Sequence, residues 1–133
     1  MEIIVPHRIR KRELDGTIPD EARKLFDKLK DKPGLAETIS ARGLPASTTL
    51  HKVYATTEGG ARRLLFFCRH APSGPGAAPE RWVLLFYRDK SDAVGRNMTH
   101  KNPEFVAELG KNLQAALADI AASTPQDLRF DSF

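Results

Sequence analysis

The sequence predicts a single α+β domain that combines a small antiparallel sheet with an N-terminal strand, a helical hairpin and a C-terminal helix. Apolar residues recur with the period of amphipathic helices in residues 19–32 and again after residue 103. Residues 48–56, 62–70 and 81–88 are rich in the β-branched, aromatic and other apolar residues typical of strands. The resulting order is β-α-α-β-β-β-α, and 133 residues fit one domain.

The first third of the chain is expected to form the N-terminal strand and the helical hairpin. Residues 2–6 (EIIVP) make a short β-prone run, and residues 7–13 add five closely spaced cations. An apolar stripe and acidic residues in the first turn indicate a helix over residues 19–32. Pro33 and Gly34 break this helix, and residues 35–41 are expected to form the second, shorter helix of the hairpin.

The middle of the chain is expected to form three antiparallel strands. Residues 62–70 and 81–88 are apolar on both faces, which is typical of central strands covered on each side. Residues 58–60 give a hairpin turn signal. Residues 71–79, with three prolines and two glycines, predict an exposed loop.

The C-terminal helix is indicated by its start signal. Asn102 is a favourable N-cap, and Pro103 suits the first helical position. Residues 1–122 are therefore expected to form one domain, followed by a tail over residues 123–133. The apolar residues near the end of that tail allow it either to dock on the domain or to fray.

Composition excludes several classes of protein. The formal charge is +4, and the excess of cations lies in the first 70 residues, which suits an anionic partner. One cysteine, Cys68, allows no internal disulfide, and its apolar surroundings favour a buried structural thiol over a nucleophile. The histidines show no metal-ligand spacing, so no metal and no cofactor are expected. No apolar run is long enough for a bilayer and no secretory signal is recognisable, so a cytoplasmic location is expected.

Cations and one phenol at the strand ends are the remaining candidates for chemistry. Adjacent antiparallel strands could gather them on one face, where they would bind RNA phosphates or cleave RNA without a metal. The alternative is that they are solvated strand ends or surface ion pairs. The residues are His51, Lys52, Arg62, Arg63, Arg69, Arg81, Tyr87, Arg88 and Lys90.

The order of motifs resembles bacterial type II toxins of the RelE/ParE superfamily, and most closely its HigB-like branch. The resemblance covers about residues 14–92. The matching stretches are ARKLFDKL (residues 22–29), KPGLAETI (32–39), the Gly43–Leu44 pair, LHKV (50–53), RLLFF (63–67) and WVLLFYRDK (82–90).

The resemblance implies a compact ribonuclease that cuts mRNA in the ribosomal A site and is neutralised by a cognate antitoxin protein. By position it implies Arg63 and Lys90 for phosphate binding and transition-state charge. It implies Lys52 as general base and Tyr87 for stacking on or orienting the RNA. His51, Arg62, Arg69 and Arg88 are the expected additional RNA-binding residues.

The sequence also departs from the family pattern. Tyr54 stands where the family often has a second basic residue, and residues 96–101 form an added segment. Two alternatives stay open: a gyrase-inhibiting toxin on the same scaffold, and a protein-interaction module that keeps only the fold. If Arg63, Tyr87 and Lys90 lie on different faces, or if the tail fills the concave face, the interaction module is favoured.

Overall fold

A computed structural model of the chain describes residues 1–39, 44–45, 48–57, 60–69 and 80–133 and confirms the α+β class. Its strands form a six-stranded sheet with the order β2-β3-β4-β5-β1-β6. The strands are β1 (Glu2–Pro6), β2 (Glu37–Ile39), β3 (Thr48–Thr57), β4 (Gly60–Arg69), β5 (Arg81–Asp89) and β6 (Phe130–Ser132). The helices are α1 (His7–Leu14), α2 (Asp20–Asp31), the 3-10 turn η1 (Pro33–Leu35) and α3 (Pro103–Ala122).

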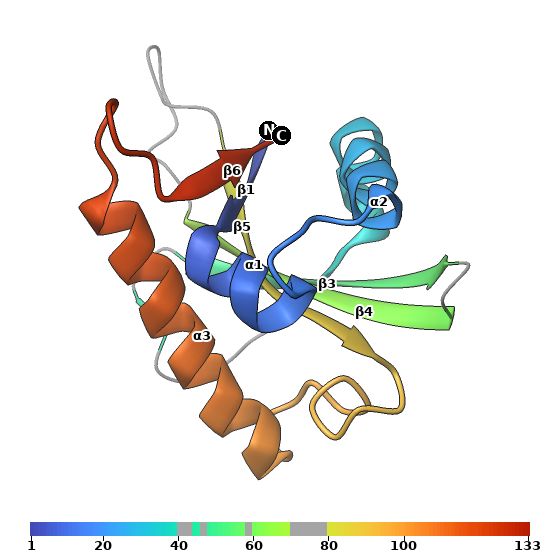
Figure 1. Cartoon of the computed structure of the whole chain (residues 1–133). Coiled ribbons are helices and arrows are strands. Elements are labelled where there is room, and N and C mark those ends of the chain that lie inside the picture. The colour runs from blue at the N-terminus through green and yellow to red at the C-terminus, as the bar shows by residue number, and fades with distance from the viewer. Residues whose placement is uncertain (40–43, 46–47, 58–59, 70–79) are drawn as a thin grey trace.

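The helices cover both faces of the sheet, with α1 and α3 on one side and α2 on the other (Figure 1). Phe86 of β5 packs against Phe105 of α3, with ring centroids 5.8 Å apart. On the opposite side Phe66 of β4 meets Phe26 of α2 edge to face at 6.1 Å. These contacts define an α3 face and an α2 face. The described helices include none that is long and apolar enough to cross a membrane.

The three predicted central strands are confirmed as β3, β4 and β5. They pair in antiparallel order, with Lys52 opposite Leu65 and Leu65 opposite Phe86. A β-bulge lies at the junction of Leu65 and Phe66, where Leu85 has no counterpart on β4. This bulge shifts the side-chain alternation of β5 by one residue between its two halves.

The sheet is mixed rather than purely antiparallel, because β1 pairs with β5 in parallel. The cationic segment after β1 forms the helix α1, which the sequence did not predict. Only two of its side chains, Ile9 and Leu14, are buried apolar residues, so its periodicity was too weak to indicate a helix.

The expected second helix of the hairpin is wrong. After α2, the chain makes the 3-10 turn η1 and then the strand β2, which pairs with β3. Of the apolar side expected for this helix, Ala36 and Ile39 pack against the core from the turn and the strand, whereas Leu35 is 55% exposed. Residues 40–41, the turn at 58–59 and the loop at 71–79 lie outside the described residues.

Side chains from α1 and α3 form hydrogen bonds with the backbone of β5 in the part of that strand that extends past β1. The buried Asn112 of α3 donates from Nδ2 to the carbonyl oxygen of Leu85 at 2.8 Å. Oε1 of Glu13 in α1 accepts the backbone N–H of Tyr87 at 3.0 Å. These contacts replace ladder hydrogen bonds that β1 is too short to provide.

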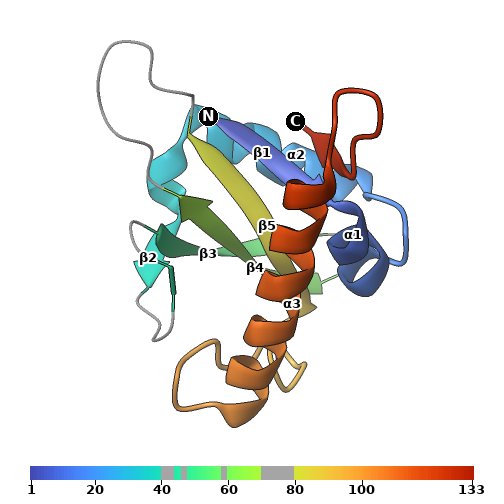
Figure 2. The same cartoon turned by 90° about the vertical axis from the view of Figure 1, so that its left-hand side faces the viewer.

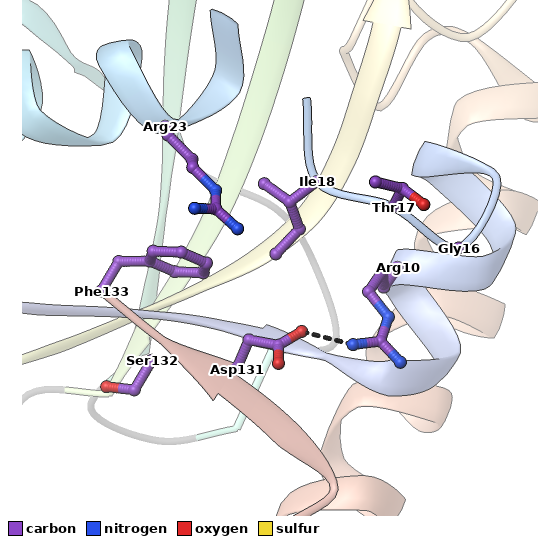
Figure 3. A pocket seen from close by; sticks show the side chains of 8 residues that line it. All are labelled: Arg10, Gly16, Thr17, Ile18, Arg23, Asp131, Ser132 and Phe133. Carbon is purple, nitrogen blue, oxygen red and sulfur yellow. Dashed lines mark hydrogen bonds and ion pairs between the residues drawn. The ribbon is translucent and has the colours of Figure 1, made fainter. Parts of the chain in front are cut away.

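The C-terminal tail docks on the domain and adds the edge strand β6 beside β1 (Figures 1 and 2). The ring of Phe133 lies 5.4 Å from that of Phe26. The tail also closes one side of a cavity of about 340 Å³, into which Arg10 and Arg23 point (Figure 3). Arg10 is ion-paired with Asp131 at 2.7 Å. Three strands separate β6 from β3, so the tail leaves the β3 end of the sheet uncovered.

Candidate functional site

The strand register divides the predicted site residues between the two faces of the sheet. Arg63 lies opposite Tyr54 on β3 and opposite Arg88 on β5, so all three share the α3 face with Lys52. Tyr87 pairs with Leu64 and therefore points to the α2 face. His51 and Arg62 lie on the α2 face as well. The structure thus brings Lys52 and Arg63 together and separates both from Tyr87.

Three of the arginines are neutralised by carboxylates. Arg62 Nη1 lies 2.6 Å from Asp89 Oδ2, and Arg81 Nε lies 2.8 Å from Glu2 Oε1. Arg88 Nε lies 2.7 Å from Glu13 Oε1. These contacts agree with the ion-pair alternative, so these three side chains carry no uncompensated charge for an anionic ligand.

Arg88 is the most strongly paired of the three. Its Nη2 donates to Glu13 Oε2 at 2.8 Å, which makes the contact bidentate, and the Glu13 side chain is only 1% exposed. Asp92 and Glu108 lie 3.3 and 3.8 Å from the same guanidinium. The hydrogen bond with Glu13 raises the pKa of Arg88 above its ordinary value. Arg88 therefore serves to join β5, α1 and α3.

Lys52 and Arg63 converge instead on the ring of Tyr54, and we call these three residues the Tyr54 cluster. Lys52 Nζ lies 5.0 Å from the ring centroid, and Arg63 Cζ lies 4.7 Å from it. Both distances suit cation–π contacts. Among the described residues neither cation forms an ion pair with a carboxylate, although Glu37 of β2 is the cross-strand neighbour of Lys52. Lys52 is 8% exposed, whereas Tyr54 is 54% exposed, so the aromatic ring forms the accessible part of the cluster.

Arg63 is also held by backbone carbonyls of the turn after β5. Its Nη1 donates to the carbonyl oxygens of Gly95 and Arg96 at 2.8 and 2.7 Å. Its buried Nε has no hydrogen-bond partner in the described part of the chain. The guanidinium is thus fixed in place, but no carboxylate of the described residues forms an ion pair with it.

The turn that presents these carbonyls is folded by Asp92. Asp92 Oδ2 accepts the backbone N–H groups of Val94 and Gly95 at 2.9 and 3.1 Å. Gly95 approaches β5 so closely that a Cβ there would lie 2.2 Å from the Asp89 carbonyl oxygen. Only glycine therefore allows this turn to reach Arg63 without a shift of the backbone.

Two residues of the α2 face, Tyr87 and Arg62, line a separate cavity of about 410 Å³ near the end of β5. The guanidinium of Arg62 lies 6.0 Å from the Tyr87 ring centroid. Burial raises the pKa of the Tyr87 phenol, and the nearby Arg62 charge opposes that rise. Tyr87 thus belongs to a different environment from Lys52 and Arg63.

Three further residues were predicted from the sequence to belong to the site, and the structure does not place them in the Tyr54 cluster. The buried His51 stacks on Trp82 with ring centroids 4.3 Å apart. Lys90 follows β5 in an exposed turn, and its role stays a prediction. Arg69 ends β4, and its side chain is outside the described set.

Cys68 is a buried thiol, as the sequence indicated. Its Sγ donates to Glu80 Oε1 at 3.1 Å. Burial, followed by the contact with Glu80, raises the pKa of Cys68 to about 12. A thiol with such a pKa stays protonated near neutral pH and is a poor nucleophile.

Sequence reasoning missed two residues of the site, Tyr54 and Gly95. Strand alternation places residues 52 and 54 on one face, so the tyrosine could have been found from its spacing to Lys52. Nothing local marks Gly95, because its role depends on the distant β5 backbone.

Comparison of the chain with protein-family models, with curated proteins and with solved structures finds no match. The fold and the side-chain geometry therefore carry the functional argument.

Proposed function

We propose that this protein is the toxin of a type II toxin–antitoxin system and that it acts on mRNA through the Tyr54 cluster. The observation that carries the proposal is the convergence, on one exposed tyrosine ring, of two cations that form no ion pair with a carboxylate among the described residues. The resemblance of residues 14–92 to RelE/ParE toxins supports the same function. A cognate antitoxin and the ribosome are the proposed partners, and no metal or cofactor enters the reaction.

The Tyr54 cluster has the chemical components for binding single-stranded RNA. Exposed aromatic rings stack on unpaired bases, and a base on Tyr54 would leave the adjacent phosphate within reach of positive charge. Arg63 already uses Nη1 for the two carbonyls, and its Nη2 has no partner among the described residues. That donor can face a phosphate oxygen.

Cleavage at this site would follow attack by the 2′-hydroxyl. Its oxygen bonds to the adjacent phosphorus as its proton passes to water, and the bond from phosphorus to the 5′-oxygen breaks as that oxygen takes up a proton from water. The products are a cyclic phosphate and a 5′-hydroxyl end. Lys52 and Arg63 would stabilise the negative charge that develops on the phosphate oxygens.

A protein-interaction module is the second candidate. It is favoured by one observation, that Arg63 and Tyr87 point to opposite faces of the sheet. In that reading the exposed Tyr54 ring with its two cations would contact a protein surface. The tail gives this reading no further support, because β6 docks at the opposite edge of the sheet.

Induced expression tests the proposal, with mRNA 5′ ends mapped by primer extension. We expect growth arrest and new cleavage ends from the natural chain, and neither from Arg63→Ala. The matched control is Arg81→Ala, which removes an arginine that is paired with Glu2 and should keep the activity. Growth arrest with DNA-damage signalling and no new mRNA ends would identify a gyrase inhibitor instead. Normal growth with intact mRNA would refute the proposal.

A further inference from the structure

The α2 face carries a second group of side chains with potential metal-ligand atoms, on the other side of the sheet from the Tyr54 cluster. His51 of β3, Cys68 of β4 and Glu80, which precedes β5, each place one potential ligand atom within 4.8 Å of the other two. The thiol and the imidazole are buried, whereas Glu80 is exposed. The group is therefore open to solvent on the side of its carboxylate.

The register explains why these residues meet. Cys68 pairs with Thr49 on β3 and with Trp82 on β5, so it points to the α2 face with its neighbours. His51 lies two residues from Thr49 on the same face, and its ring stacks on Trp82. Two neighbouring strands and the residue before a third thus hold the group, and sites built on sheet strands are more precise than sites on loops.

Polar partners orient two of the three side chains. Trp82 Nε1 donates to Glu80 Oε1 at 3.0 Å, which fixes the carboxylate. The two ring nitrogens of His51 lie 2.9 Å from Thr49 Oγ1 and 3.3 Å from Thr38 Oγ1. A metal-binding histidine commonly holds its second nitrogen by such a hydrogen bond. One nitrogen could therefore take a metal while the other keeps a threonine hydroxyl.

We propose that His51, Cys68 and Glu80 bind a divalent transition-metal ion of the zinc type. One nitrogen, one sulfur and one carboxylate oxygen form a ligand set that zinc accepts, with a fourth position left for water. Tetrahedral zinc separates its ligand atoms by about 3.5 Å. The present separations of 4.8 Å or less, and of 3.1 Å between Sγ and Oε1, need only small side-chain adjustments to match that value.

Binding would replace the hydrogen bond between Cys68 and Glu80 with two bonds to the metal. The thiol proton would leave to solvent as the thiolate–metal bond forms. The site does not depend on the proposed RNA chemistry, because Lys52, Tyr54 and Arg63 point to the opposite face.

Metal binding by the purified full chain tests this proposal. The protein is loaded with Zn²⁺, desalted and analysed for metal, and Co²⁺ is then used as a spectroscopic probe. We expect one equivalent of Zn²⁺ and a near-ultraviolet thiolate-to-cobalt charge-transfer band. Zinc should also raise the melting temperature, because it binds the folded state.

Variants separate this site from other metal contacts. Cys68→Ser should abolish the charge-transfer band, and Glu80→Gln should weaken zinc binding at least about tenfold. Trp82→Phe, which removes the hydrogen bond to Glu80, should weaken it about 10- to 100-fold. His100→Gln, at an exposed histidine elsewhere, is the matched control and should bind as the natural chain does.

Glu80→Gln keeps the test decisive if the buried substitutions fail to fold, because Glu80 is exposed. A natural chain that retains less than a tenth of an equivalent of Zn²⁺ would overturn the proposal. So would a cobalt complex without the thiolate band, or a Glu80→Gln protein with unchanged affinity.

Discussion

Arg63 Nη1 donates to the backbone carbonyl oxygen of Gly95 at 2.8 Å, and this contact ties the Tyr54 cluster to the turn after β5. The turn is folded by Asp92, which also lies 3.3 Å from Arg88. Arg88 on β5 pairs with Arg63 on the neighbouring strand β4, so two positive charges lie side by side on the same face. Carboxylates around Arg88 neutralise its charge, whereas Arg63 has no ion pair with a carboxylate in the part of the chain that the structure describes.

Gly95→Ala should destabilise the fold and loosen Arg63. The added Cβ would lie 2.2 Å from the Asp89 carbonyl oxygen and 2.9 Å from Arg88 Cβ, so the turn must move. We expect a loss of about 1–3 kcal/mol in the free energy of unfolding, measured by urea denaturation. Gly110→Ala is the control, because an alanine there meets nothing within 4 Å and should slightly stabilise α3. Equal effects of the two substitutions would contradict the close approach at Gly95.

Glu13→Gln should destabilise the domain by weakening its contact with Arg88. The Glu13 side chain is 1% exposed and accepts hydrogen bonds from both Arg88 and the Tyr87 N–H. Water therefore cannot readily replace Glu13 as the partner of the Arg88 guanidinium. Breaking a buried pair costs about 3–5 kcal/mol, and Asp92 and Glu108 should keep the loss near the lower end. Denaturant titration measures the change.

Asp127→Asn provides the matched control for that experiment. Asp127 is paired with Arg129, but its side chain is 68% exposed. Its loss should change stability by less than about 1 kcal/mol. A Glu13→Gln protein as stable as Asp127→Asn would show that the Glu13–Arg88 contact does not hold α1 to the sheet.

The Tyr87 phenol should ionise above its ordinary pKa of 10, because burial penalises the phenolate. The chain has two tyrosines, so ultraviolet titration of Tyr54→Phe reports Tyr87 alone. The folded state retains the proton longer than the unfolded state, so Tyr87 should stabilise the fold less as the pH rises from about 10 through its folded pKa. The same titration in denaturant should return the ordinary value. A midpoint at or below that value in the folded protein would show that Tyr87 is not in the buried environment described.

Much of the fold was predictable because it rests on local patterns. The apolar runs of β4 and β5 and the N-cap at the start of α3 can each be recognised from a few neighbouring residues. The strands β2 and β6 escaped prediction because each has three residues and exists only by pairing with a partner strand. Their formation depends on contacts distant in sequence, which local propensity does not contain.

The residue types of the candidate site could be predicted from the sequence, but which of these side chains lie together on one face of the sheet could not. Position at strand ends gave nine candidates, and the family resemblance selected Lys52, Arg63 and Tyr87 among them. The face of each side chain depends on how β3, β4 and β5 are aligned. That register places Arg63 opposite Arg88, so the next residue back, Tyr87, points to the other face. The carboxylates that neutralise Arg88 come from α1, α3 and the turn after β5, and no local pattern links them.

Tyr54→Ala should weaken binding of a single-stranded RNA oligonucleotide, whereas Tyr54→Phe should retain most of it. A stacked base contributes about 1–3 kcal/mol, and the phenyl ring preserves the stacking surface. Fluorescence anisotropy of a labelled oligonucleotide measures both affinities. Similar losses for alanine and phenylalanine would mean that the hydroxyl group, rather than the ring, makes the contact.

The role of Arg63 is tested most directly by the salt dependence of RNA binding in Arg63→Ala and Arg62→Ala. The two arginines are adjacent in sequence but lie on opposite faces, and Arg62 is paired with Asp89. We predict that Arg63→Ala lowers the affinity and reduces the slope of log K against log salt by about 0.7, the value for one single-strand phosphate contact. Arg62→Ala should leave both unchanged. Loss of affinity in Arg62→Ala with normal binding in Arg63→Ala, or no RNA binding by the natural chain, would contradict the account.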